Sequence, residues 1–225
     1  MKGRQSNSIS VGGDVSGSVV AGNRNVVQHT PRPQTAEAGE PAEGLTPRLG
    51  FVFDIVGYGG RLAEGKADLE ERLSSLTRRV VADLGIDLED TRYAVSGDGI
   101  VVFLPVGVAS TRVLPTLICA ASSRLASDNN RFRDRMRLRL AVGSGLLGDG
   151  PLGFTGDLVV DLHRLVDSDV LRQAVRENPK ADLAILVSAA LHDEVVRPGY
   201  LDARDFTRCE VTTKEFSAPA WLRLC

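Results

Sequence analysis

The stretch that decides the fold is Phe51-Val-Phe-Asp-Ile-Val-Gly-Tyr-Gly-Gly60. Its apolar residues predict a short buried strand that ends at one carboxylate, Asp54, and its glycines predict a tight loop after that strand. Further along, Tyr93-Ala-Val-Ser-Gly-Asp-Gly-Ile-Val-Val-Phe-Leu104 predicts a hairpin whose turn carries a second carboxylate, Asp98.

This pair of carboxylates indicates a particular chemistry. Two acidic side chains at the ends of adjacent strands can share hard divalent cations, and free backbone amides in a glycine-rich turn can hold the phosphates that those cations neutralise. We therefore predict a site for a nucleoside triphosphate and metal ions. The alternative is that Asp54 only ends a strand and that Asp98 occupies an ordinary hairpin turn, because Asp-Gly is a common hairpin signal.

The composition is that of an ordinary soluble protein. The chain has 225 residues, of which 43% are hydrophobic and 25% charged, which suits one large domain or a domain with appendages. The net charge of −2 and the pI of about 6.0 predict no nucleic-acid partner. No apolar run reaches the roughly 18 residues of a membrane span, and the N-terminus lacks the hydrophobic region of a signal peptide. Three widely spaced cysteines predict reduced thiols in a cytoplasmic protein.

Residues 1–28 differ from the rest of the chain. They are rich in Gly, Ser, Asn and Val, and Asn7-Ser-Ile-Ser-Val-Gly-Gly-Asp-Val-Ser-Gly-Ser-Val-Val-Ala-Gly-Asn-Arg-Asn-Val-Val-Gln28 consists of short β-prone pieces broken by turn residues. Copies of such a segment can stack in register as cross-β structure. The segment resembles the RHIM-like amyloid signalling motifs of bacterial immune-type proteins, especially actinobacterial ones. That resemblance implies self-assembly or recruitment through residues 7–28 in bacterial signalling or defence; the alternative is a disordered tail or a small hairpin.

The remainder divides into a linker and a folded domain. Residues 29–47 are rich in Pro, Ala and Glu, which is linker composition, so the domain is expected to span residues 48–225. Within it, apolar residues at helical spacing predict a long helix that Gly85 stops; they are Leu69, Leu73, Leu76, Val80 and Leu84.

Further sequence patterns predict the other strands and helices of the domain. Strands are predicted at 92–96, 100–104, 136–143, 183–187, 208–213 and 220–224, and helices at 107–127, 157–166, 169–176 and 189–196. The strand at 136–143 alternates apolar residues with Arg137, Arg139 and Ala141, which predicts a half-buried strand. The order strand, helix, hairpin, helix, strand predicts an α+β fold with a ferredoxin-like core and appended elements.

Three motifs together resemble class III nucleotide cyclase domains. They are the Phe-Asp-Ile-Val-Gly-Tyr strand, the Gly-Asp-Gly hairpin and the segment Gly156-Asp-Leu-Val-Val-Asp-Leu-His-Arg-Leu165, and the similarity runs from about Leu49 to Leu224. The resemblance implies a nucleotidyl cyclase, a phosphorus–oxygen lyase that uses two Mg²⁺ or Mn²⁺ ions. In such enzymes the ribose 3′-hydroxyl of a nucleoside triphosphate attacks the α-phosphorus and expels pyrophosphate, which leaves a cyclic nucleotide second messenger.

The resemblance also assigns roles to residues. Asp54 and Asp98 would be the metal ligands, with the Ile55 carbonyl assisting. Arg164 matches the arginine that stabilises the transition state, and Lys214, in Val211-Thr-Thr-Lys-Glu-Phe-Ser217, is the candidate for the triphosphate-binding lysine. The backbone amides that would cradle the phosphates are those of Val56, Gly57, Tyr58 and Gly59. Because these groups come from different protomers in that family, an active enzyme would be a homodimer.

The departures from the family pattern matter as well. The asparagine that orients the ribose is replaced by Val160, and the two positions that select a purine hold Ala94 and Gly153, which cannot distinguish adenine from guanine. The substrate could be a pyrimidine nucleotide with Arg92 or Tyr93 near the base. Two hypotheses follow: a divergent cyclase, or a degenerate cyclase-like adaptor that is recruited through its N-terminal motif.

Overall fold

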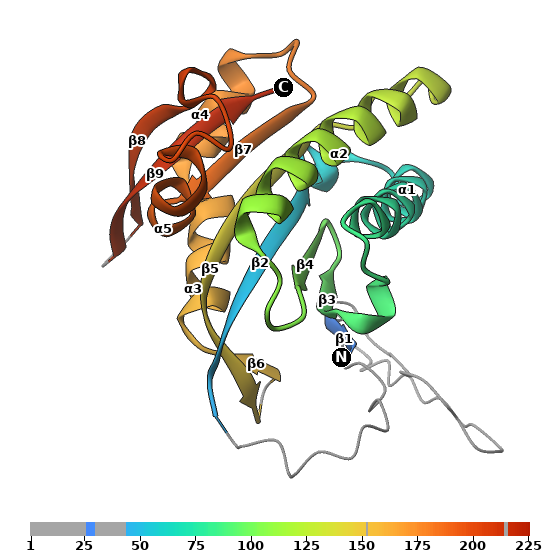
Figure 1. Cartoon of the computed structure of the whole chain (residues 1–225). Coiled ribbons are helices and arrows are strands. Elements are labelled where there is room, and N and C mark those ends of the chain that lie inside the picture. The colour runs from blue at the N-terminus through green and yellow to red at the C-terminus, as the bar shows by residue number, and fades with distance from the viewer. Residues whose placement is uncertain (1–25, 30–43, 152, 214–215) are drawn as a thin grey trace, which may run out of the picture.

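The computed structural model describes residues 26–29, 44–151, 153–213 and 216–225. In these residues, nine strands form one mixed sheet in the order β1-β3-β4-β2-β5-β7-β9-β8, and β6 pairs only with β5 (Figure 1). All the pairings are antiparallel except that of β5 with β7. The strands are β1 (Val26–His29), β2 (Thr46–Ile55), β3 (Arg92–Ser96), β4 (Gly99–Phe103), β5 (Leu138–Gly150), β6 (Gly153–Thr155), β7 (Leu183–Ser188), β8 (Thr207–Thr213) and β9 (Phe216–Leu224).

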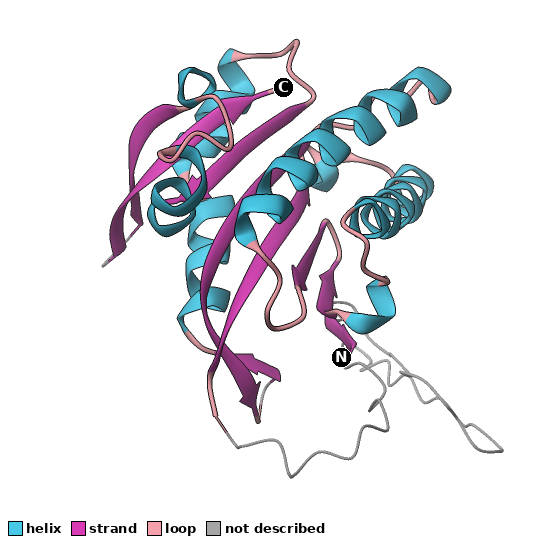
Figure 2. Ribbon diagram, viewed as in Figure 1, coloured by secondary structure: helices cyan, strands magenta, loops and turns pink. Residues whose placement is uncertain are grey.

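Helices cover both faces of this sheet (Figures 1 and 2). Two long helices lie side by side on one face, and two shorter ones pack on the opposite face with their own apolar cluster. The helices are α1 (Ala63–Asp83), α2 (Ser110–Arg131), α3 (Asp157–Val166), α4 (Asp169–Glu177) and α5 (Ala189–Leu191). The predicted α+β class is therefore confirmed.

The long helices follow largely from the sequence. The predicted apolar stripe of α1 is buried along its whole length, and Gly85, at φ 77°, lies just beyond its end. The predicted end of α2 at residue 127 is wrong. Asp128 continues the helix because its carboxylate accepts two hydrogen bonds from buried Arg72 of α1, at 2.9 and 2.7 Å. A buried ion pair between neighbouring helices thus overrides a local stop signal.

The alternation of side chains along β2 determines which face of the sheet carries Asp54. Phe51, Phe53 and Ile55 face α1 and α2, whereas Val52 and Asp54 face the side covered by α3. The sequence predicted a strand at 136–143 with one buried face. A strand forms there, but the prediction of one exposed face is wrong, because most of its residues are buried on both faces of the sheet. Helix α3 packs directly on β5: a Cβ added at Gly145 would lie 3.3 Å from the Cβ of Leu158.

The last residues of the N-terminal segment join the sheet as part of strand β1. β1 pairs antiparallel with β3, with Val26 opposite Ser96 and His29 opposite Tyr93. The rest of the predicted signalling segment and residues 30–43 of the predicted linker lie outside the described residues. Cys119, Cys209 and Cys225 are free thiols. Within the described ranges, no helix has the length and apolarity needed to cross a bilayer.

Gly156, which precedes α3, allows a test of the packing between α3 and β5. Its φ is 116°, and an added Cβ would lie 2.2 Å from the carbonyl oxygen of Leu146. We expect Gly156→Ala to lower the free energy of unfolding by at least about 3 kcal/mol, because the backbone must move to admit the methyl group. Urea denaturation measures this loss.

Gly199→Ala is the matched control for this substitution. Gly199 has a φ of 95°, but an added Cβ there would meet no atom within 4 Å. Only the conformational cost of about 1–2 kcal/mol is expected at this position. Equal losses in the two variants would contradict a specific role for the contact with Leu146.

Candidate functional site

The two predicted carboxylates lie at the ends of neighbouring strands. Asp54, the penultimate residue of β2, is opposite Gly99 of β4, the residue that follows Asp98. The backbone N–H of Ile55 donates a hydrogen bond of 2.8 Å to the carbonyl oxygen of Asp98, which fixes the β3–β4 turn against the end of β2. The turn is formed by Gly97, at φ 53°, and Asp98.

The strand register also directs the carbonyl of Ile55. In an extended strand, the N–H and C=O groups of one residue point to the same neighbouring strand. Since the N–H of Ile55 points to the Asp98 turn, its carbonyl points there too, and no backbone donor among the described residues is bonded to it. The carbonyl therefore faces the turn that carries Asp98.

Arg139 of β5 completes this end of the sheet and was not predicted as a site residue. It lies directly opposite Asp54 in the β2–β5 ladder. Its Nε and Nη2 atoms donate hydrogen bonds of 2.8 and 2.5 Å to Oδ2 of Asp54. The ion pair is largely enclosed, because the two side chains are only 14% and 12% exposed.

Burial raises the pKa of Asp54 to about 6 from its ordinary value of 3.8. The neighbouring charge and hydrogen bonds of Arg139 lower this pKa, whereas the negative charges of Asp98 and Asp167 raise it further. Asp167, directly after α3, is a second group at this end of the sheet that the sequence did not single out. One guanidinium therefore offsets only part of the cost of burying the Asp54 carboxylate, to which the neighbouring acids add.

The residues present fit a hard divalent cation. The described residues contain no cluster of three or more His, Cys, Asp or Glu side chains that could hold a metal ion by themselves. The donor set at the β2 end is instead two carboxylates and one carbonyl, all oxygen donors of the kind that Mg²⁺ and Mn²⁺ prefer. Both hydrogen bonds from Arg139 fall on Oδ2 of Asp54, which leaves Oδ1 for a cation. Asp54, Ile55 and Asp98 are the residues that would hold it.

The loop after β2 has the geometry of an anion-binding turn. Gly57 adopts the left-handed backbone conformation, with φ 75° and ψ 13°, and the 3₁₀ turn η1 (Tyr58–Gly60) follows it. Among the described residues, the amides of Gly57, Tyr58 and Gly59 donate to no other group, and such successive free amides form a concave anion site. The amide of Val56 donates to the carbonyl of Arg137 at 2.9 Å, so its predicted role in phosphate binding is not supported.

Arg164 lies on α3, the helix that covers the Asp54 face of the sheet. Its guanidinium is 4.9 Å from the ring centre of Phe216 and 3.8 Å from the carboxylate of Asp161. Val160, one helical turn earlier, is 44% exposed. Both side chains are thus reachable from solvent. The assigned role of Arg164 stays a prediction, and Lys214 lies outside the described residues.

The three residues predicted near the base do not share one face of β3. Arg92 and Ala94 face the side of Asp54, and Ala94 belongs to the apolar cluster under α3. Tyr93 packs against the opposite cluster, under α1 and α2. A base on the Asp54 face would therefore meet Arg92 and Ala94 but not Tyr93.

Superposition on solved structures identifies the fold of this chain. A guanylyl cyclase, Cya2, superposes with a TM-score of 0.54 and 15% identity over 81% of this chain and 93% of that one. The chain has the nucleotide cyclase fold. The adenylate/guanylate cyclase/hydrolase from Silicibacter pomeroyi superposes with a TM-score of 0.53 and 16% identity, covering 80% of this chain and 98% of that one.

A third structure carries a nucleotide. The guanylate cyclase domain of RhGC from Catenaria anguillulae, in complex with GTP, gives a TM-score of 0.52 and 14% identity over 80% of this chain and 96% of that one. No protein-family model and no curated protein sequence matches the chain. At these identities, the superpositions establish the fold, and the activity must be argued from the site.

The raised pKa of Asp54 predicts how cation binding depends on pH. The folded protein retains a proton on Asp54 between pH 3.8 and about 6, where the unfolded chain has lost it, so the contribution of this group to stability falls as the pH rises through that range. A cation needs the ionised carboxylate. We therefore expect Mn²⁺ affinity to fall about tenfold per pH unit below 6 and to level off above it. Electron paramagnetic resonance of free Mn²⁺ measures this, and a flat profile would contradict it.

Arg139 is expected to compete with the cation for Asp54. Arg139→Met removes the competing charge and retains an unbranched side chain, so Mn²⁺ should bind about tenfold more tightly at pH 8. Arg124→Met, which breaks an ion pair with Asp83 between α1 and α2, should leave the affinity unchanged. Isothermal titration with Mn²⁺ compares the two variants. Weaker binding in Arg139→Met would show that Arg139 supports the cation site instead.

Proposed function

We propose that the protein is a metal-dependent nucleotidyl cyclase that converts a nucleoside triphosphate to a cyclic nucleotide second messenger. The observation that carries the proposal is the arrangement at the end of β2. There, the Asp54 carboxylate, the Ile55 carbonyl and the Asp98 turn converge beside three free amides, on a fold whose solved examples include cyclases.

Each group has a defined task in this proposal. Asp54 and Asp98 would hold two Mg²⁺ or Mn²⁺ ions with the help of Ile55, and such ions would supply Lewis-acid stabilisation of the reacting phosphate. The amides of Gly57, Tyr58 and Gly59 orient the β- and γ-phosphates. The ribose 3′-oxygen loses its proton and attacks the α-phosphorus, and pyrophosphate leaves. Arg164 stabilises the negative charge that develops on the phosphorus-bound oxygens.

The complete site requires two copies of the chain in this proposal. The solvent-reachable side of α3, with Val160 and Arg164, would meet the metal-binding end of a second copy in a homodimer. The N-terminal residues 7–28 would bring copies together or recruit them into a bacterial signalling or defence pathway, since proximity alone raises the effective concentration of dimerising domains.

A second candidate function is a cyclase-like adaptor without turnover. Val160 and Ala94 favour it, because neither side chain offers a hydrogen bond at positions where the resemblance implies polar contacts to the ribose and the base. Loss of one such orienting contact typically costs a factor on the order of 10²–10³ in rate. That loss is compatible with slow, triggered synthesis, so the cyclase remains our first proposal.

The test is a product assay with the full chain. Purified protein is incubated with ATP, GTP, CTP or UTP and Mn²⁺, and the products are separated by chromatography. We expect cyclic product from at least one nucleotide, and a loss of at least about 100-fold in Asp98→Ala, which removes one metal ligand. Asp87→Ala, an exposed acid before the η2 turn (Leu88–Asp90), is the control and should keep full activity. Nucleotide binding without any product would favour the adaptor.

A further inference from the structure

A charged and aromatic cluster lies near the two positions that have lost their base-selecting residues. We call it the Arg92 cluster; it consists of Arg92 of β3, Asp149 of β5 and Phe154 of β6. The guanidinium of Arg92 is 5.0 Å from the ring centre of Phe154 and forms an ion pair with the Asp149 carboxylate. The arginine side chain is only 9% exposed, whereas that of Asp149 is 76% exposed. The cluster is therefore closed toward the sheet and open on its carboxylate side.

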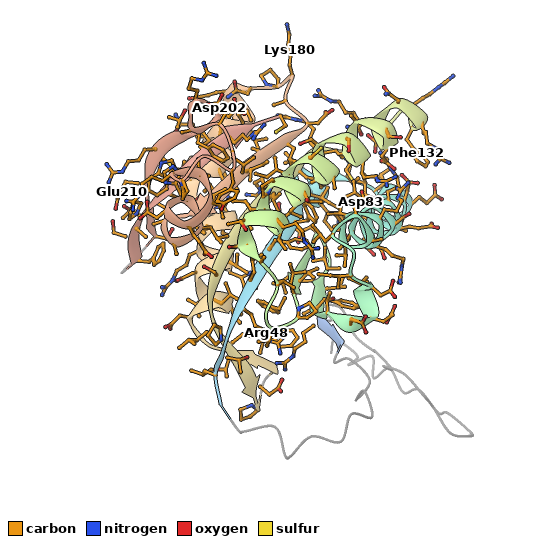
Figure 3. All side chains as sticks on the ribbon, in the orientation of Figure 1. Arg48, Asp83, Phe132, Lys180, Asp202 and Glu210 are labelled. Carbon is orange, nitrogen blue, oxygen red and sulfur yellow. The ribbon has the colours of Figure 1, made fainter. Side chains whose placement is uncertain are left out.

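Arg92 has hydrogen-bonding capacity that the described residues do not use. Its Nε is buried and has no acceptor among them. Burial lowers the pKa of Arg92, and the positive charge of nearby Arg48 of β2 lowers it further. The Nε of Arg48 is also buried without an acceptor among the described residues. Figure 3 shows Arg48 at the end of the sheet where β6 lies. Arg48 itself donates a hydrogen bond of 3.0 Å from Nη1 to the carbonyl oxygen of Leu104, whereas Arg92 pairs with the carboxylate of Asp149.

Unused buried donors of this kind indicate a missing acceptor. A buried donor without a partner costs about 1–3 kcal/mol, and such groups persist where a ligand satisfies them. The guanidinium is a planar fork that binds two neighbouring acceptors at once. The Phe154 ring adds an apolar surface on which a flat group can stack. Together, these features suit a planar ring whose edge presents a pair of acceptors.

The position of the cluster relates it to the proposed nucleotide site. Arg92 and Ala94 are two residues apart on the face of the sheet that carries Asp54, about 7 Å from each other along the strand. Gly153 directly precedes Phe154 and pairs with Gly150, the residue after Asp149. The small residues Ala94 and Gly153 therefore contribute no polar side chain of their own beside the cluster.

We propose that Arg92 and Asp149, with the Phe154 ring, recognise the base of the nucleotide. The proposal rests on the proposed function and adds the class of substrate. Arginine pairs with the neighbouring acceptors O6 and N7 of guanine. Cytosine offers a comparable pair, O2 and N3, and both bases carry an amino group that can donate a hydrogen bond to the Asp149 carboxylate. Adenine and uracil present no two adjacent acceptors, so the site favours guanine or cytosine nucleotides.

Binding of the four nucleotides to the full chain tests this specificity. Non-cyclisable analogues of GTP, CTP, ATP and UTP are titrated calorimetrically in the presence of Mn²⁺. We expect the GTP or the CTP analogue to bind at least tenfold more tightly than the ATP and UTP analogues, and the stronger of the two identifies the base. Equal binding of all four analogues would overturn the proposal and leave the cyclase function standing.

Substitutions within the Arg92 cluster test whether it is the source of the preference among the four bases. Arg92→Met should abolish the tenfold preference while the ATP and UTP analogues bind as before, because their affinity comes from the triphosphate. Asp149→Asn should also reduce the preference. Arg208→Met, at an exposed position of β8, is the control and should change nothing. If Arg92→Met does not fold, Arg92→Lys keeps the charge but removes the planar fork, and the same loss of preference is expected.

The outcomes separate the two proposals. A preference that survives in Arg92→Met or Arg92→Lys overturns the role of the cluster but not the cyclase function. Failure of every analogue to bind overturns both. An altered order among the four bases in the variants, with unchanged binding of Mn²⁺, supports base recognition by Arg92, because a merely structural role would not change which base is preferred.

Discussion

The rest of the structure depends on the burial of β2. This strand lies between β4 and β5 and is covered by helices on both faces, so its alternating side chains enter two separate apolar clusters. Its penultimate residue is a carboxylate, and burial of that charge is costly. Arg139 offsets part of the cost from the neighbouring strand. A cation at Asp54, as we propose, would have to compete with this contact.

The two ends of the proposed nucleotide site differ in how much of the cyclase pattern they keep. The end at Asp54 and Asp98 retains oxygen donors and free amides. The end at Ala94 and Gly153 has small side chains where the resemblance implies polar ones, but the Arg92 cluster places a guanidinium, a carboxylate and an aromatic ring near them. Contacts to the phosphates and contacts to the base can therefore diverge separately on one backbone.

A shared fold does not by itself assign an activity to this chain. Identities of 14–16% to solved cyclase structures establish a common backbone, and many backbones support more than one activity. The proposal of turnover rests instead on the convergence of specific oxygen atoms and amides at one strand end. Val160 is exposed on α3, at the position where the resemblance implies a polar residue.

The sequence by itself determined the α+β class, the apolar stripe of α1, and a carboxylate at the end of each of two segments. These features depend on local periodicity and turn chemistry, which a single chain displays directly. Only the tertiary structure decided that Arg139 pairs with Asp54, that Asp128 continues α2, and that the amide of Val56 is occupied. Each of these depends on strand register or helix packing between residues far apart in the chain, and alternation within one strand does not reveal which partner lies across from it.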